Sequence, residues 1–174
     1  MISPKSIHSV KQNLKHLVKM TTKKKILLSL SIGVLIVVGI VLYIFNQPAR
    51  DVQATKTDFN FNASAIVNEY LTDAHAANAK YLDEEGESNV LEITGTVASI
   101  SEDFDNQKVI LLKNPTDKAG VSATFTQETN VNTNTVKVGD EITIKGVIRS
   151  GAAYDPDLEM YENVIIDKCD IVSK

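Results

Sequence analysis

The sequence predicts a mainly β fold: a five-stranded barrel preceded by one packing α-helix, behind a single N-terminal transmembrane helix. Two observations predict it, an uncharged apolar run at residues 26–45 and a change near residue 83 from helical spacing to strand alternation. The chain has 174 residues, and about 125 follow the apolar run, which is one domain's worth. We therefore divide the chain into a basic cytoplasmic tail (1–25), a transmembrane helix (26–45), a linker (46–61) and a helix-plus-barrel domain (62–174).

The run from Ile26 to Phe45 contains 20 residues and no charge. As a helix rising 1.5 Å per residue it would span about 30 Å, the thickness of the hydrocarbon core of a bilayer. Residues 1–25 hold seven lysines and no acid. The positive-inside rule therefore predicts a single-pass protein of the inner (cytoplasmic) membrane, with its N-terminus in the cytoplasm and its C-terminal domain periplasmic or otherwise extracytoplasmic.

Two alternatives remain for this end of the chain. The apolar run could be a signal peptide cleaved after Val52-Gln53-Ala54, although it is longer than a usual signal core and Ala54 lies nine residues beyond it. Translation could start at Met20, which three lysines follow closely. If it starts at Met1, residues 1–19 either form a basic helix on the inner leaflet or have no regular structure.

Beyond residue 61 the sequence predicts one helix and then strands. The helix begins at Asn62 and runs to Tyr81 or Leu82, because apolar residues recur there at spacings of three and four. The predicted strands cover residues 90–100, 108–113, 120–126, 141–149 and 159–172. Gly95 in the middle of the first strand indicates a bend or bulge, so this strand can serve both halves of a small barrel. Five such strands favour the OB-fold, a partly open Greek-key barrel.

Several segments carry a family resemblance. They are Asn78-Ala-Lys-Tyr81, Ile93-Thr-Gly-Thr-Val97, Gly120-Val-Ser-Ala-Thr-Phe125, Val138-Gly-Asp-Glu-Ile-Thr-Ile-Lys-Gly146 and Asp167-Lys-Cys-Asp-Ile171. With them, residues 78–172 resemble the tRNA-anti-like family of bacterial OB-fold proteins. The resemblance implies the fold and an exported or membrane-anchored location, and it implies no established reaction. The family often has a cysteine near the position of Ala123; if that cysteine meets the Cys169 position, this chain lacks the partner.

The sequence shows no catalytic set. The histidines are His8, His16 and His75, so residues 83–174 offer no histidine as a general base or triad member. With the single cysteine Cys169 there is no usual zinc site, and no phosphate-binding glycine loop occurs. We therefore expect no enzyme, no cofactor and no metal. Calcium in the acidic loops 103–106 and 155–159 is a weaker alternative, and Cys169 is expected to be a core residue rather than a reactive thiol.

The predicted function is a non-enzymatic binding or scaffolding module of unknown ligand. OB-folds bind along their second and third strands and the flanking loops. Here that surface would offer Lys108, Lys113, Ser122, Thr124, Thr126 and Tyr154.

Oligonucleotide binding is the alternative function. Beyond residue 25, however, 11 basic residues face 22 acidic ones, and the net charge of −11 repels polyanions. We expect an envelope protein or glycan as the partner and make no prediction of oligomeric state. In a further alternative, the helix before the barrel caps one barrel end and closes the site.

Overall fold

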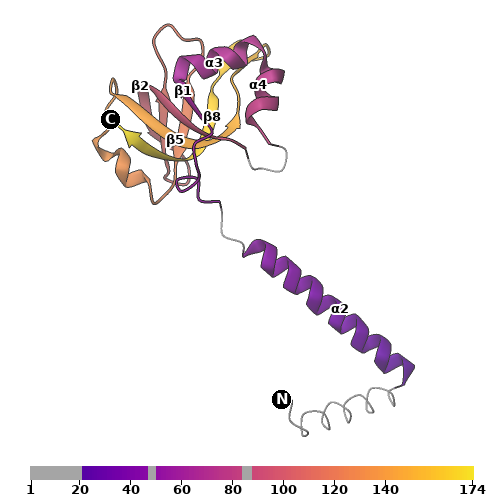
Figure 1. Ribbon diagram of the computed structural model, residues 1–174. Helices are drawn as coiled ribbons and strands as arrows, with labels where there is room; N and C mark the ends of the chain where they lie inside the picture. Colours follow the sequence, from indigo (N-terminus) through magenta and orange to yellow (C-terminus); the bar gives the residue numbers. More distant parts are fainter. Residues whose placement is uncertain (1–20, 47–49, 84–87) are drawn as a thin grey trace. The chain divides into compact units, whose positions relative to one another are not determined.

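The computed structural model describes residues 21–46, 50–83 and 88–174 (Figure 1). The chain forms two compact units, residues 1–49 and 50–174. Most of the predicted basic tail, including the alternative helix over residues 1–19 and the alternative start at Met20, lies outside the described residues.

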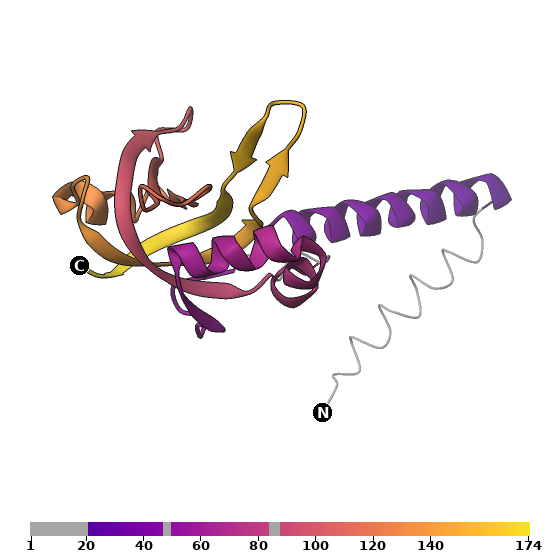
Figure 2. The same cartoon turned by 90° about the horizontal axis from the view of Figure 1, so that it is seen from above.

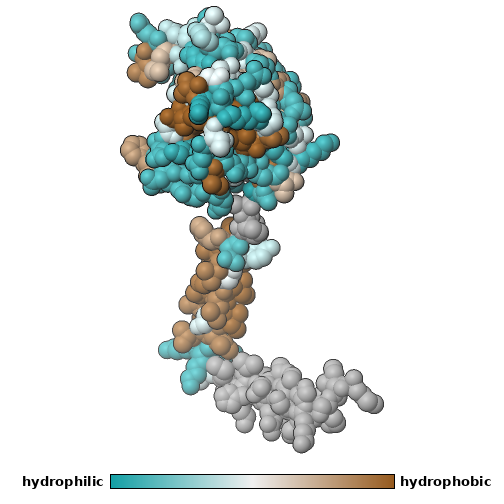
Figure 3. All heavy atoms as spheres, turned by 90° about the vertical axis from the view of Figure 1, so that its left-hand side faces the viewer, coloured by the Kyte–Doolittle hydropathy of each residue, from teal (hydrophilic) through white to brown (hydrophobic). Residues whose placement is uncertain are grey.

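The first unit contains α2 (Thr22–Phe45), which covers the predicted transmembrane run. Its apolar side chains are exposed, and Figure 3 shows how they dominate its surface. Two serine hydroxyls within the helix are paired with backbone: Ser29 donates to the Ile26 carbonyl at 2.9 Å and Ser31 to the Leu27 carbonyl at 3.0 Å. In the described part of the chain, α2 is the one helix long and apolar enough to cross a bilayer.

The second unit is built on strands that close into a barrel (Figure 1). They are β2 (Val90–Glu102), β3 (Lys108–Leu112), β4 (Val121–Phe125), β5 (Glu141–Ser150) and β8 (Val164–Ser173). β2, β3 and β4 pair antiparallel in that order, β4 pairs parallel with β8, and β8 pairs antiparallel with β5, which returns to β2. This closed path confirms the predicted five-stranded OB-fold barrel.

β2 serves both halves of the barrel, as its central glycine predicts. Its first half pairs with β5 as far as Thr96, and from Val97 onwards it pairs with β3. A Cβ on Gly95 would lie 2.9 Å from the Cβ of Ala63 and 3.2 Å from that of Leu112. The glycine therefore lets the start of α3 (Ala63–Thr72) and β3 approach β2 closely where the strand changes partner.

The single helix predicted for residues 62–82 is two helices, α3 (Ala63–Thr72) and α4 (Ala74–Tyr81). The helix is interrupted at Asp73, whose backbone is extended, with a φ of −151°. The Asp73 carboxylate accepts the N–H of Ala76 at 3.0 Å. This aspartate caps α4, so the chain changes direction although the apolar spacing continues across the break.

α3 covers one end of the barrel and shares its core. The buried residues of α3 are Ala63, Ile66, Val67 and Tyr70. Inward-facing strand residues of the same core include Ile93, Ile110, Leu112, Phe125 and Ile144. Helix and barrel are therefore one folding unit rather than two layers with separate cores.

The structure differs from the predicted linker over residues 46–61, because the chain is docked on the barrel from Arg50 onwards. β1 (Phe59–Asn62) pairs parallel with the first half of β2. Val52 is buried in a small cluster with Val90 and Val147. The sequence of residues 46–61 resembles a linker because it is polar and lacks periodicity. The pairing of β1 depends on its contact with β2, which the local sequence does not indicate.

The chain between β4 and β8 also has more structure than predicted. A 3₁₀ helix, η1 (Asn130–Thr135), follows β4. β6 (Ala153–Asp155) and β7 (Met160–Glu162) form a hairpin, so the single strand predicted for residues 159–172 is divided between β7 and β8.

Candidate binding face

The outer surface of β3 and β4 is the candidate site that the fold provides. Alternate residues of both strands are buried, and the residues between them are half-exposed. Antiparallel pairing sets Leu111 opposite Ser122 and Val109 opposite Thr124, while Ile165 of β8 lies beside Ser122. We call these five residues the β3–β4 face: a small apolar surface with two hydroxyl groups.

Three of the six predicted binding residues belong to this surface or its margin. Ser122 and Thr124 lie on the β3–β4 face. Lys113 follows β3 and continues its alternation, and its Nζ donates to the carbonyl of Lys118 at 3.2 Å. Their role in binding stays a prediction.

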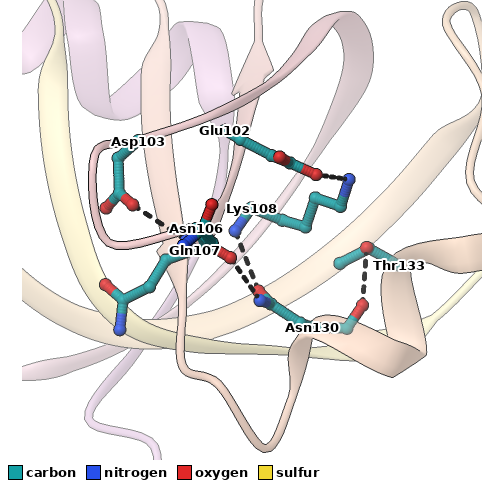
Figure 4. Close-up of polar contacts among 7 residues, drawn as sticks. All are labelled: Glu102, Asp103, Asn106, Gln107, Lys108, Asn130 and Thr133. Atoms are coloured by element: carbon teal, nitrogen blue, oxygen red, sulfur yellow. Dashed lines mark hydrogen bonds and ion pairs between the residues drawn. The ribbon is translucent and has the colours of Figure 1, made fainter.

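Lys108 lies at the start of β3, among contacts that hold the loop after β2 (Figure 4). Its ammonium group pairs with Glu102, and its backbone N–H donates to Oδ1 of Asn130 at 2.8 Å. The Asn130 amide in turn donates to the carbonyl of Asn106 at 2.9 Å. Both the side chain and the backbone N–H of Lys108 therefore stabilise the loop. The sequence around Lys108 does not indicate these contacts.

Thr126 also takes part in local structure, at the turn that follows β4. Its N–H donates to the hydroxyl of Thr129 at 2.9 Å, and that hydroxyl donates to the Cys169 carbonyl at 2.7 Å. These bonds connect the end of β4 to β8. Thr126 therefore stabilises a turn, whereas Ser122 and Thr124 lie on the β3–β4 face.

Tyr154 lies on β6, where its ring packs against Tyr161 of β7 with centroids 4.9 Å apart. The Nζ of Lys118 lies 5.3 Å from the Tyr161 ring centroid. We call Lys118, Tyr154 and Tyr161 the tyrosine–lysine cluster. Figure 2 shows the β6–β7 hairpin (gold) and the turn after β2 projecting on the same side of the barrel.

Sequence reasoning missed Val109, Leu111, Ile165 and Lys118 as members of the candidate site. The first two stand in an unbroken apolar run, Val-Ile-Leu-Leu, which gives no polar contrast to show which side faces water. Lys118 lies in an irregular loop, and no local signal places it over a tyrosine far along the chain.

The alternative in which the helix caps the barrel is right in part. α3 does cover one barrel end, where a Cβ on Gly151 would lie 1.9 Å from the Tyr70 ring. The β3–β4 face lies on the wall of the barrel, and its residues remain half-exposed or exposed. The cap therefore leaves this face open.

Three groups with catalytic or metal-binding potential, Cys169, Asp103 and Asp155, are held by the fold. Cys169 is buried, and burial raises the pKa of its thiol well above the usual range, with Asp167 adding to the effect. In the acidic loops, Asp103 accepts the N–H of Gln107 at 2.8 Å and Asp155 that of Asp157 at 2.8 Å. Among the described residues no group of three His, Cys, Asp or Glu side chains is placed to hold a metal ion.

The sequence model of the tRNA_anti-like family matches residues 20–156. None of the curated proteins compared with the chain matches it. Among solved structures, the chain is similar to a lipoprotein from Klebsiella pneumoniae whose name suggests that it binds nucleic acid. The two share 13% identity with a TM-score of 0.49, and the match covers 73% of this chain and 100% of the lipoprotein chain. The chain is also similar to Entamoeba histolytica asparaginyl-tRNA synthetase, at 11% identity and a TM-score of 0.35, covering 56% and 23%. Neither distant likeness bears on function.

Proposed function

The chain belongs to the tRNA_anti-like family, and we propose that it is a membrane-anchored, extracytoplasmic binding module that performs no catalysis. The observation that carries the proposal is the β3–β4 face. Its apolar side chains and hydroxyls lie on the wall that OB-folds use for ligands, and the capping helix leaves them open.

The anchor in this proposal is α2, retained in the mature protein. Lys23, Lys24 and Lys25 lie in its first turn, which favours a cytoplasmic N-terminus. Cleavage after Ala54 would remove Val52 from the barrel, where it is buried, and Gln53, whose amide donates to the Lys168 carbonyl at 2.8 Å. Loss of these contacts disfavours the signal-peptide alternative.

Orientation and retention have direct tests. A reporter that is active only outside the cytoplasm, fused after Lys174, should be active, and the matching cytoplasmic reporter should be silent. The mass of the protein extracted from membranes should include α2. Activity of the cytoplasmic reporter alone, or a mature N-terminus at Thr55, contradicts this part of the proposal.

The burial of Cys169 and the hydrogen bonds of Asp103 and Asp155 support the absence of catalysis. The thiol of Cys169 is inaccessible, and the carboxylates of Asp103 and Asp155 are occupied by backbone N–H groups of their own turns. A carboxylate held in this way stabilises a turn and is poorly placed to transfer protons to a ligand.

The ligand in this proposal is an envelope protein or glycan, because the acidic domain repels polyanions. A photo-crosslinking amino acid in place of Ser122, in the full-length chain in its own cells, should yield a discrete adduct. The same substitution at the exposed residue Glu141, on a different strand, is the control. No adduct from Ser122, or equal adducts from both positions, contradicts a binding role for the β3–β4 face.

One observation favours oligonucleotides as a second candidate. The tyrosine–lysine cluster combines two rings with a cation, the groups that single-stranded nucleic acids stack on and pair with. Filter binding of single-stranded DNA and RNA at low salt tests this candidate. Micromolar or tighter binding that weakens on Lys118→Ala and Tyr154→Ala would favour it over the envelope ligand.

A further inference from the structure

The β6–β7 hairpin exposes large apolar side chains. Leu158 is 67% exposed, Met160 51% and Tyr154 50%. They lie on ten consecutive residues that extend from the barrel (Figure 2). Exposed apolar side chains gathered on one projecting element are typical of an interaction surface.

The hairpin is held in a defined shape. Oδ1 of Asp155 accepts the N–H groups of Asp157 and Leu158 at 2.8 and 3.1 Å, which fixes the turn. At the base, the Tyr154–Tyr161 ring contact joins the two strands. A hairpin ordered in advance loses little conformational entropy on binding.

The charged residues of the hairpin itself are all acidic. Asp155, Asp157, Glu159 and Glu162 lie on the hairpin, and residues 153–162 include no Lys or Arg. The carboxylates at the tip repel nucleic acids and anionic lipid headgroups there, whereas Lys118 lies against Tyr161, away from the tip. The acidic tip complements a protein surface whose apolar pocket is bordered by lysine or arginine.

We propose that the β6–β7 hairpin docks into an apolar, basic-rimmed groove of a partner protein, with Leu158 and Met160 inserted and the tip carboxylates pairing with the rim. This goes beyond the proposed function, because the hairpin would bind a protein whatever the β3–β4 face binds. Loss of the adduct from Ser122 would therefore leave this proposal standing.

The test is site-specific crosslinking with the full-length chain in its own membranes. p-Benzoylphenylalanine replaces Leu158, and in the control it replaces Val131, a residue of η1 with a similar exposure of 63%. A second pair of variants adds charge reversal to the Leu158 probe, either Asp157→Lys with Glu159→Lys or the control Glu141→Lys. Asp155 is left intact because it holds the turn.

We expect one protein adduct from Leu158 and none from Val131. Its crosslinked peptide should come from an apolar segment flanked by basic residues, and its yield should fall at least fivefold on charge reversal at the tip but not at Glu141. The absence of an adduct, an adduct with lipid or with a second copy of this chain, or insensitivity to charge reversal would overturn the proposal. If the double-lysine variant melts early, Asp157→Asn with Glu159→Gln replaces it, and at least a twofold fall is expected.

Discussion

The hydroxyl of Tyr81 donates a hydrogen bond of 2.8 Å to Oε2 of Glu69, which joins α4 to α3. The Nζ of Lys80 pairs with the other carboxylate oxygen at 2.9 Å and lies 5.5 Å from the ring centroid of Phe59 in β1. One carboxylate and its two partners therefore connect both helices with the N-terminal strand.

This arrangement predicts a pH-dependent contribution to stability. Desolvation raises the pKa of Glu69, but the hydrogen bonds from Lys80 and Tyr81 outweigh it, and the pKa lies below its usual value of 4.5. A lowered folded-state pKa gives stability that is present above the unfolded-state pKa and lost as pH falls through the folded one. Glu69→Gln should therefore destabilise the domain at pH 7, and the difference from wild type should shrink towards pH 3.

Denaturant unfolding of the detergent-solubilised full chain at both pH values measures this difference. Glu141→Gln, at an exposed position of β5, is the control and should change little at either pH. A Glu69→Gln deficit that is as large at pH 3 as at pH 7 would show that packing, not charge, dominates at this position.

The two core tyrosines should respond in opposite ways to loss of their hydroxyls. Within the described structure Oη of Tyr70 is buried without a hydrogen-bond partner, and burial, with Tyr81 and Glu69 nearby, raises its pKa to about 12. Tyr70→Phe should stabilise the domain by about 1 kcal/mol, because it removes an unsatisfied polar group. Tyr81→Phe should destabilise it by about 1 kcal/mol, because it removes a made bond. Thermal unfolding compares the two, and destabilisation by Tyr70→Phe would mean that its hydroxyl has a bound water.

Gly151 is predicted to tolerate no side chain. A Cβ there would meet the buried Tyr70 ring at 1.9 Å, and a ring packed in the core cannot move aside cheaply. Gly151→Ala should lower the free energy of unfolding by about 1–3 kcal/mol, the usual cost of overpacking. Adding Tyr70→Leu should recover part of that loss, measured as a positive coupling in a double-mutant cycle. Strictly additive effects would contradict the contact.

The loop after β2 should depend on one amide side chain. Asn130 accepts from the Lys108 N–H and donates to the Asn106 carbonyl, at 2.8 and 2.9 Å. Asn130→Ala should cost about 1 kcal/mol and speed hydrogen exchange at Lys108, because it removes the partner of the part-buried Lys108 N–H. Asn132→Ala, which removes an exposed contact with Asp170, should cost less than about 0.5 kcal/mol. Equal effects of the two changes would contradict the structural role of Asn130.

Local signals in the sequence predicted most of the fold. Alternation located the barrel strands, and Gly95 marked the point where β2 changes partner. The interruption of the helix at Asp73 was not predicted, because a capping side chain leaves the apolar spacing unchanged. Pairing of β1 and the contact of Lys118 with Tyr161 join segments far apart along the chain, which no local pattern records.

The pairing of β1 with β2 has a consequence for handling the domain in solution. β1 occupies the edge of β2 opposite β5, and a bare strand edge is a template for intermolecular pairing. A fragment begun at Arg50 should stay monodisperse, whereas one begun at Ala63 would present that edge and self-associate. The short segment before the helices thus protects the barrel against aggregation.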